Sequence, residues 1–282
     1  MPIIRLLILL FFLVDCSKLV AQKDTSATWI VKGGAKDQIE LWSAPIKIKL
    51  KHIPIITAIG GLTASGILFD EKIYSLTQKH TTTVPWLYEG SKYITYGGKG
   101  YTAIGIGSVF YLSGHLSKNN KHLTTGALCY EAYVQAGLIA NIGKVIFSRK
   151  RPIGGNGINT YPDGQSKWHF FPGYLNVFQG DSHRNYSSFP SGHSTTAWAI
   201  ATIIAKQYNK TKWIPTICYS SAFLVSISRV LLNNHWSSDI VVGAAIGYGV
   251  GHFLYKKRNN THWTLFPSSF KKNISLTAVY NL

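Results

Sequence analysis

The chain is poor in acidic residues and in charged residues of any kind. Only 14% of its 282 residues are charged, against roughly 25% in soluble domains. Asp and Glu together number 11 while Lys and Arg number 29, which gives a net charge of +18. Such an excess implies anionic partners: nucleic acid, an acidic membrane surface or phosphorylated substrates. The basic residues fall mostly between apolar runs, which is typical of membrane proteins and not of a basic tail.

Cysteines are also scarce, and no stretch resembles a linker between two domains. The three cysteines give no disulfide framework, and Cys129 and Cys218 lie inside apolar runs, where buried thiols are expected. The length then predicts one large helical domain.

Most apolar runs fall short of the ~20 residues expected of a bilayer-spanning helix, yet exceed the 10–14 typical of a buried core helix. They are rich in Gly, Ala, Ser or Thr, which let helices approach closely. The six runs are 53–69, 101–116, 123–142, 193–205, 213–228 and 240–255. We therefore predict an all-α fold, a bundle of about six core helices that is embedded in a membrane or associated with one.

Three glycines recur at every fourth residue in the last run, at Gly243, Gly247 and Gly251. Each step of four residues overshoots a helical turn by about 40°, so the glycines drift away from the face of the preceding residues. We expect them to seat a neighbouring helix.

The remaining segments divide the chain further. Residues 1–21 resemble an export signal or an N-terminal anchor, with a basic residue ahead of an apolar core. Residues 22–52 form a basic N-terminal segment, 53–258 the helical domain and 259–282 a C-terminal tail whose weak alternation at 274–279 predicts one edge strand.

Positive charge offers a topology for the runs. Basic clusters at 47–51, 118–121, 206–212 and 256–258 are expected in the cytoplasm, which leaves the connections 70–100, 143–192 and 229–239 outside. A cleaved signal would instead place the new N-terminus outside. Either the signal stays attached and one run does not span, or the runs are core helices of an exported protein resting on the membrane.

The connection between the last two runs carries the first chemical signal. His235 and Asp239 are four residues apart, so on a helix they lie one turn apart on the same face. A carboxylate beside an imidazole fixes its tautomer and favours its charged form. Arg229, at the end of the preceding run, offers a fork of donors to an anion. This spacing is also that of a structural hydrogen bond.

Two further clusters flank the outward connections. Lys144 is followed by Arg151-Pro152, and Pro190-Ser191-Gly192-His193 opens the fourth run. In this order and at these spacings, the three clusters resemble the signature of the type 2 phosphatidic acid phosphatase family, whose superfamily includes bacterial acid phosphatases and vanadium haloperoxidases. The resemblance covers roughly residues 53–255. The signature positions are Lys144, Arg151, Pro152, Pro190, Ser191, Gly192, His193, Ser228, Arg229, His235 and Asp239.

The residue types suit phosphoryl transfer, whose catalysis is mostly electrostatic stabilisation of the equatorial oxygens. Lys144, Arg151 and Arg229 supply three cations, while Ser191 and Gly192 would offer backbone N–H groups at a helix N-terminus.

The resemblance implies a role for each remaining signature residue. His235 would attack phosphorus and form a phosphohistidine, and Asp239 would orient it. His193 would protonate the leaving oxygen and then activate water.

The long stretch 153–189 lacks periodicity and is expected to be a functional loop. Within it, His183 and Arg184 are candidates for contact with a second phosphate or a head group. A two-metal site needs several carboxylates, and the clusters hold Asp239 alone, so no metal is expected.

The expected function is hydrolysis of a phosphate ester or diphosphate without a metal or other cofactor, through a phosphohistidine. The expected substrate is a lipid such as undecaprenyl diphosphate, phosphatidate, phosphatidylglycerol phosphate or lipid A. The alternatives are a haloperoxidase that uses vanadate, a periplasmic acid phosphatase with a soluble substrate, and a non-catalytic transporter or scaffold. The expected partners are this substrate and a membrane, and not nucleic acid. The site is expected to face the periplasm, from the inner membrane or from an exported, membrane-associated protein.

Overall fold

The computed structural model describes residues 27–43, 49–152, 168–170, 185–259, 263–270 and 273–280. The expected export signal, residues 1–21, lies outside the described residues, as do most of the long loop and with it His183 and Arg184.

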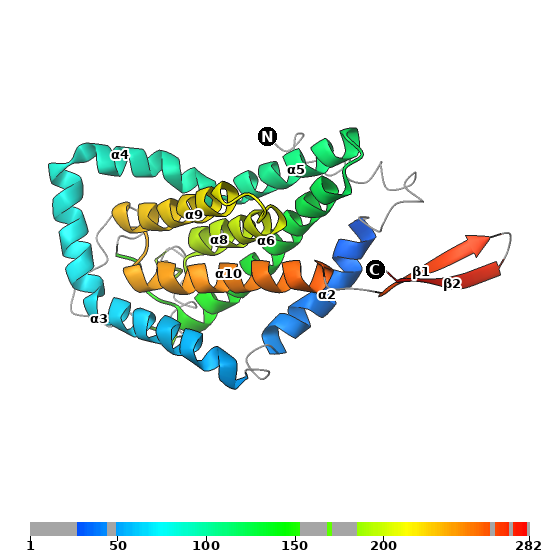
Figure 1. The fold of residues 1–282 in the computed structure, drawn as a ribbon. Coiled ribbons are helices and arrows are strands. Elements are labelled where there is room, and N and C mark those ends of the chain that lie inside the picture. Colours follow the sequence, from blue (N-terminus) through cyan, green and yellow to red (C-terminus); the bar gives the residue numbers. More distant parts are fainter. Residues whose placement is uncertain are drawn as a thin grey trace.

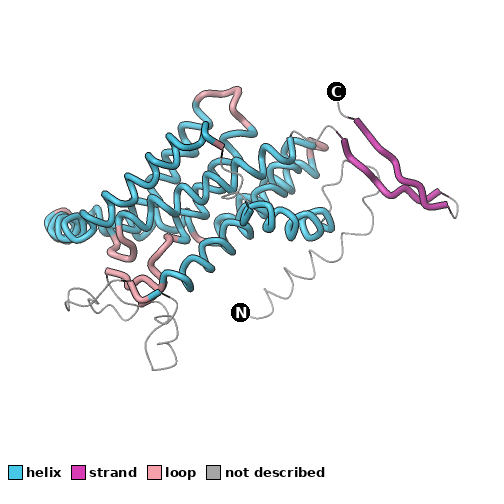
Figure 2. Tube along the Cα trace, turned by 90° about the horizontal axis from the view of Figure 1, so that it is seen from below, coloured by secondary structure: helices cyan, strands magenta, loops and turns pink. Residues whose placement is uncertain are grey.

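The described residues form a bundle of helices, with a small β-hairpin that stands apart from it (Figures 1 and 2). The helices are α2 (Ala27–Ser43), η3 (Leu50–His52), α3 (Ile53–Thr83), α4 (Pro85–Ile94), η4 (Thr95–Gly98), α5 (Gly100–Leu116), α6 (Asn120–Phe147), α8 (Gly192–Gln207), α9 (Trp213–Leu231) and α10 (Ser237–Asn259). Each of the six apolar runs lies in one long helix, which confirms the predicted helical bundle. The expected edge strand is present as β2 (Asn273–Tyr280), which pairs antiparallel with β1 (Trp263–Phe270).

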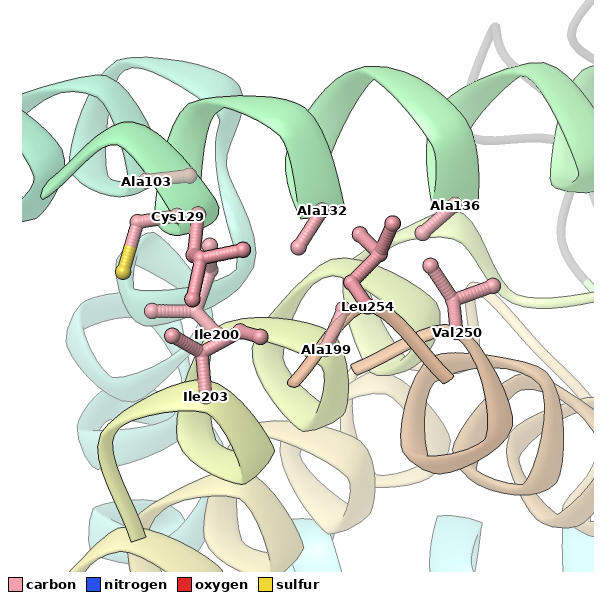
Figure 3. Packing of buried hydrophobic residues seen from close by; sticks show 10 residues of the cluster. Ala103, Cys129, Ala132, Ala136, Ala199, Ile200, Ile203, Val250 and Leu254 are labelled. Atoms are coloured by element: carbon pink, nitrogen blue, oxygen red, sulfur yellow. The ribbon is translucent and has the colours of Figure 1, made fainter. Parts of the chain in front are cut away.

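The core lies where α6, α8 and α10 meet, with one contribution from α5 (Figure 3). Its alanines, such as Ala132 and Ala199, are fully buried and allow the helices to approach closely. Cys129 is fully buried as predicted, whereas Cys218 is only partly buried because it lies on α9, near the bundle surface.

The glycines of α10 form the seat of α8, as their spacing predicts. A Cβ atom on Gly243 would lie 2.7 Å from the carbonyl oxygen of Ser191, and one on Gly251 would lie 2.8 Å from that of Ala199. A Cβ atom on Gly247 would collide with the carbonyl oxygen of Thr195. The absence of side chains therefore lets the backbones of α8 and α10 touch.

Helix α3 is longer than the apolar run that predicts it. The sequence interpretation placed 70–100 in an outer connection, but α3 continues to Thr83 and α4 and η4 follow it. Threonines of this extension hydrogen-bond within the helix, since the Thr77 and Thr81 hydroxyls donate to carbonyl oxygens one turn earlier. With α4, this half of α3 makes an arch at one end of the bundle (Figure 1).

Two helical stretches are long and apolar enough to cross a bilayer, Leu50–Thr83 and Trp213–Leu231. Their apolar side chains face outward: Leu68 of α3 is 80% exposed and Ile217 of α9 is 62% exposed. Exposed apolar area of this extent marks an interaction surface, and it supports membrane association.

Helix α2 lies in the segment predicted only as basic. Its Leu41 packs against the core. It also forms ion pairs with α10: Lys257 and Arg258 both pair with Asp37, and Lys257 also pairs with Glu40. Two cations of the cluster at 256–258 thus bind the protein itself. A helix held by ion pairs presents no apolar run, which is why the pattern did not reveal it.

Candidate active site

Eight of the ten predicted site residues lie within the described residues, and the structure places them at four helix ends and in the connections beside them. They are Lys144, Arg151, Ser191, Gly192, His193, Arg229, His235 and Asp239. The three cations all act electrostatically on both imidazoles, so stretches far apart in the chain meet at one place.

The end of α6 sets the position of two cations. The helix is terminated by Ser148 in the left-handed conformation, with φ 39°, and the chain then turns into the bundle. Arg151 is buried there, and its guanidinium donates to the carbonyl oxygens of Ser187, at 3.1 Å, and Asn234, at 3.2 Å. Lys144 lies in the last turn of α6, only partly buried, on the side of the start of α8.

The start of α8 lies directly against the Lys144 amine. A Cβ atom on Gly192 would lie 3.2 Å from Nζ of Lys144, so glycine leaves room for an anion between the backbone and the cation. The backbone N–H of Ser191 donates to the carbonyl oxygen of Asp239. Its hydroxyl is fully buried and has no hydrogen-bond partner among the described residues. This hydroxyl and the helix N-terminus are available to a phosphate.

Helix η4 closes the other side of the site, and sequence reasoning missed it. Thr95 accepts a hydrogen bond from Nη1 of Arg229 at 2.7 Å. A Cβ atom on Gly98 would lie 2.7 Å from Cβ of His193, so η4 presses its backbone onto the histidine. The Gly97-Gly98 pair was the available signal, since adjacent glycines often mark a close backbone approach.

His235 is fully buried and its ring is held at one nitrogen. Nδ1 lies 2.7 Å from the carbonyl oxygen of Ser188 and 3.5 Å from Oδ2 of Asp239. Because a carbonyl only accepts, the ring carries its hydrogen on Nδ1 and keeps a lone pair on Nε2. That tautomer is the one a nucleophile needs. The Ser188 carbonyl could not be found from sequence, since a backbone oxygen has no residue-type signal.

Burial and positive charge lower the pKa of three groups at the site, His193, His235 and Lys144. Burial, then Arg229 and His235, hold the pKa of His193 far below its usual value, at about 2. Burial, then Arg151, Arg229 and Lys144, hold the pKa of His235 well below its usual value. Burial and the two arginines lower the pKa of Lys144 to about 8. A site that pushes protons off its own groups is one that favours an anion.

Asp239 has more partners than the sequence suggests. Its Oδ1 accepts a charge-assisted hydrogen bond from Arg149, and its Oδ2 accepts from the Ser188 hydroxyl and from the Trp236 N–H. These bonds leave the carboxylate little capacity to bind a metal. Within the described part of the chain, no three His, Cys, Asp or Glu residues gather as metal ligands.

A cavity of about 630 Å³ opens from the site. It is lined by Lys144, Gly192 and His193 of the site and by residues of α5 and α6, among them Tyr101, Tyr133 and Leu138. Lys99 lies on the wall formed by η4 and α5, where its ammonium sits 4.1 Å from the centre of the Tyr96 ring. The cavity therefore joins a cationic end to a largely apolar and aromatic channel.

Comparisons with known proteins agree with this chemistry. Residues 126–263 match the family model of the PAP2 superfamily. The chain is similar to a lipid A 1-phosphatase of Porphyromonas gingivalis, with 41% identity over 24% of this chain and 16% of the relative. It is also similar to a lipid A 4′-phosphatase of the same organism, with 26% identity over 60% of this chain and 66% of the relative. The chain thus spans less than two thirds of either relative's length.

Two solved structures are also similar to this chain. They are LpxE of Aquifex aeolicus, with 22% identity over 67% of this chain and 95% of that one, and a transmembrane PAP2 type phosphatidylglycerolphosphate phosphatase of Bacillus subtilis, with 18% identity over 83% and 98%. Both have a TM-score of 0.46. The matched residues 126–263 contain all ten predicted site residues. The resemblance read from the sequence is thereby confirmed: over residues 126–263 the chain matches the PAP2 superfamily.

Proposed function

We propose that the protein is a phosphatase that hydrolyses a phosphate ester or diphosphate carried by a lipid, without a metal. The observation that carries this proposal is a cluster of charges: Lys144, Arg151 and Arg229 all act on a buried His235 whose Nε2 holds a lone pair. Three cations can stabilise the charge on the equatorial oxygens of a transferring phosphoryl group, which is the larger part of catalysis in such reactions.

In the first step, Nε2 of His235 attacks phosphorus, the bond from phosphorus to the lipid oxygen breaks, and His193 gives that oxygen a proton. The phosphorylated imidazole is positively charged, and Asp239 at 3.5 Å from Nδ1 stabilises it. In the second step, His193 takes a proton from water, the water oxygen attacks phosphorus, and the P–N bond breaks. Inorganic phosphate leaves, and both histidines return to their starting forms.

The low pKa of His193 in the empty pocket is compatible with these two steps, because bound substrate raises it. The empty pocket keeps the imidazole neutral, because burial and four neighbouring groups disfavour a further positive charge. A bound phosphate dianion adds negative charge beside the ring and raises its pKa, so His193 can hold a proton when the leaving oxygen needs one.

A lipid substrate is favoured over a soluble one by the surroundings of the pocket. The channel beyond His193 is lined by Tyr101, Tyr133 and Leu138, which suit an acyl chain or a sugar face better than water. The outward apolar surfaces of α3 and α9 support a position of the site near a bilayer. Since the relatives are named lipid A phosphatases, lipid A phosphate is the first substrate to test.

We also propose that the site faces the periplasm. The connections at 118–121 and 206–212 lie at the helix ends opposite the site and are basic, as cytoplasmic connections are. Single cysteines placed in the two basic connections are expected to resist a membrane-impermeant maleimide in intact cells. Labelling of those cysteines would contradict the orientation.

The activity is tested with purified protein in detergent and EDTA. Phosphate release is measured from lipid A, phosphatidate, phosphatidylglycerol phosphate and undecaprenyl diphosphate. Wild type is expected to release phosphate from at least one of them, and His235→Ala is expected to release none while keeping its thermal melting point. Failure of wild type on every substrate, or full activity in His235→Ala, would refute the proposal. Halide oxidation with vanadate and peroxide would instead support the haloperoxidase alternative.

A further inference from the structure

Helix α3 carries a buried carboxylate, which is unusual in a helix that is long and apolar enough to cross a bilayer. Asp70 is 1% exposed, although it belongs to α3, a helix with many exposed apolar side chains. Buried charge at such a position is costly unless it is paired and hydrogen-bonded, and it usually marks function. Asp70 is therefore expected to have a buried cation as its partner.

That partner is Arg149, which no signature position includes. Its Nη2 donates to Oδ2 of Asp70 at 2.6 Å, and its Nη1 donates to Oδ1 of Asp239. The guanidinium is fully buried between two indole rings, 4.4 Å from the Trp168 centroid and 5.4 Å from that of Trp236. One rigid cation thus bridges a carboxylate on α3 and the carboxylate beside the nucleophile.

The start of α10 completes the connection. Oδ1 of Asp70 accepts from the Ser237 hydroxyl, at 2.7 Å, and from the Ser238 N–H, at 3.2 Å. Its Oδ2 accepts from the Ser238 hydroxyl, which also accepts from Arg149. Asp70 therefore holds the first residues of the helix that carries Asp239, so the orientation of Asp239 depends on it.

Charge gives Asp70 a second consequence. Arg149 and Asp239 alone would form a neutral pair, whereas Asp70 makes the trio carry one net negative charge. This matters beside His235, whose ring becomes cationic on phosphorylation. Among the described residues, the other charged or titratable groups that act on it are three cations, of α6, of the segment after α6 and of α9, and the second imidazole, of α8: Lys144, Arg151, Arg229 and His193.

We propose that Asp70 is a positioning residue of the nucleophile, which acts through Arg149 to hold Asp239 in place and to keep its negative charge effective at His235. This inference rests on the proposed phosphohistidine chemistry. It assigns a catalytic consequence to α3, a helix outside the matched family region 126–263.

The test compares Asp70→Asn with Asp37→Asn. Asp37 is an equally buried carboxylate in an ion-pair cluster with Lys257 and Arg258, away from the site, so its variant controls for the loss of a buried charge. Phosphate release is measured against pH, with the lipid A, phosphatidate or other substrate that wild type accepts. Asp70→Asn is expected to lower kcat on the order of tenfold with KM changed less than about twofold. The acid limb of kcat/KM should move to lower pH by about half a unit or more, because the imidazole has lost negative charge. Asp37→Asn should melt earlier but keep the wild-type kcat and acid limb.

A double variant separates charge from folding. Asp70→Asn with Arg149→Gln removes one charge of each sign, so the trio keeps its net charge and no unpaired buried cation remains. We expect its acid limb to return to the wild-type position even if kcat stays low. If Asp70 were only a structural anchor, the loss of Arg149 would raise the limb to higher pH. This variant decides the matter alone if Asp70→Asn does not fold.

The outcomes separate the two proposals. Asp70→Asn with wild-type kcat and acid limb, while His235→Ala is inactive, would overturn this inference and leave the phosphatase standing. An inactive wild type would overturn the proposed function. In that case orthovanadate binding, measured by calorimetry on wild type and on the Asp70→Asn variant, still tests the link. Equal affinities would overturn it, and at least about threefold weaker binding by the variant would support it.

Discussion

Replacing Lys144 with arginine should extend the activity to alkaline pH. Burial, Arg151 and Arg229 lower the pKa of this lysine to about 8, against a smaller opposing effect of Asp239. Half of the free enzyme then lacks this cation at pH 8, and about nine tenths lacks it at pH 9, so kcat/KM should fall about tenfold per pH unit above pH 8. A phosphomonoester is already a dianion there, since its second pKa is about 6, so the fall belongs to the enzyme.

Arginine keeps its charge to above pH 12, so Lys144→Arg should abolish this fall up to about pH 10. Its larger side chain beside Gly192 is expected to lower the rate severalfold at pH 7. The assay is phosphate release at subsaturating lipid between pH 6 and 10. Lys99→Arg is the matched control, because Lys99 lines the same cavity outside the phosphate end and should leave the alkaline fall in place. A flat wild-type profile to pH 10, or an unchanged fall in Lys144→Arg, would refute the assignment of this limb to Lys144.

Three further predictions concern packing, acid stability and specificity. Gly247→Ala should destabilise the protein by about 1–3 kcal/mol in thermal melts, because its Cβ meets the Thr195 backbone. Gly249→Ala, whose Cβ would have no atom within 4 Å, should be neutral or stabilising by up to about 1 kcal/mol. Equal melting points for the Gly247→Ala and Gly249→Ala variants would contradict the close packing of α8 against α10. The fold holds His235 neutral while the unfolded chain takes up a proton below its usual pKa of 6.5, so the stability present above pH 6.5 is lost as pH falls. His235→Asn should reduce this loss by about 1.4 kcal/mol per pH unit in melts between pH 6.5 and 5, and parallel curves would argue against it. Lys99→Ala should raise KM for bis-phosphorylated lipid A about three- to tenfold more than for the monophosphorylated form, if Lys99 meets a second phosphate; equal changes would exclude that contact.

The helices could be predicted because apolar periodicity and small residues are local properties of the chain. The apolar pattern of residues 240–255 predicts that α10 is buried. Its glycine spacing predicts the face against which a neighbouring helix, α8, packs. The signature residues could also be identified, since the types and the spacing of histidine, lysine, arginine and aspartate can be read directly from the sequence. Helix α2 was not visible, because Asp37 and Glu40 contact the bundle through ion pairs.

The sequence by itself therefore determined a helical bundle and the candidate residues for binding a phosphate. Only the tertiary structure decided how those residues are held. Asp70 is 79 residues from Arg149, which in turn lies 90 residues from Asp239, and no local pattern relates them. The acceptor for His235 is a backbone oxygen of Ser188, which any residue type could supply. Long-range contacts and backbone groups depend on where helices cross, and that is set by packing of the whole chain.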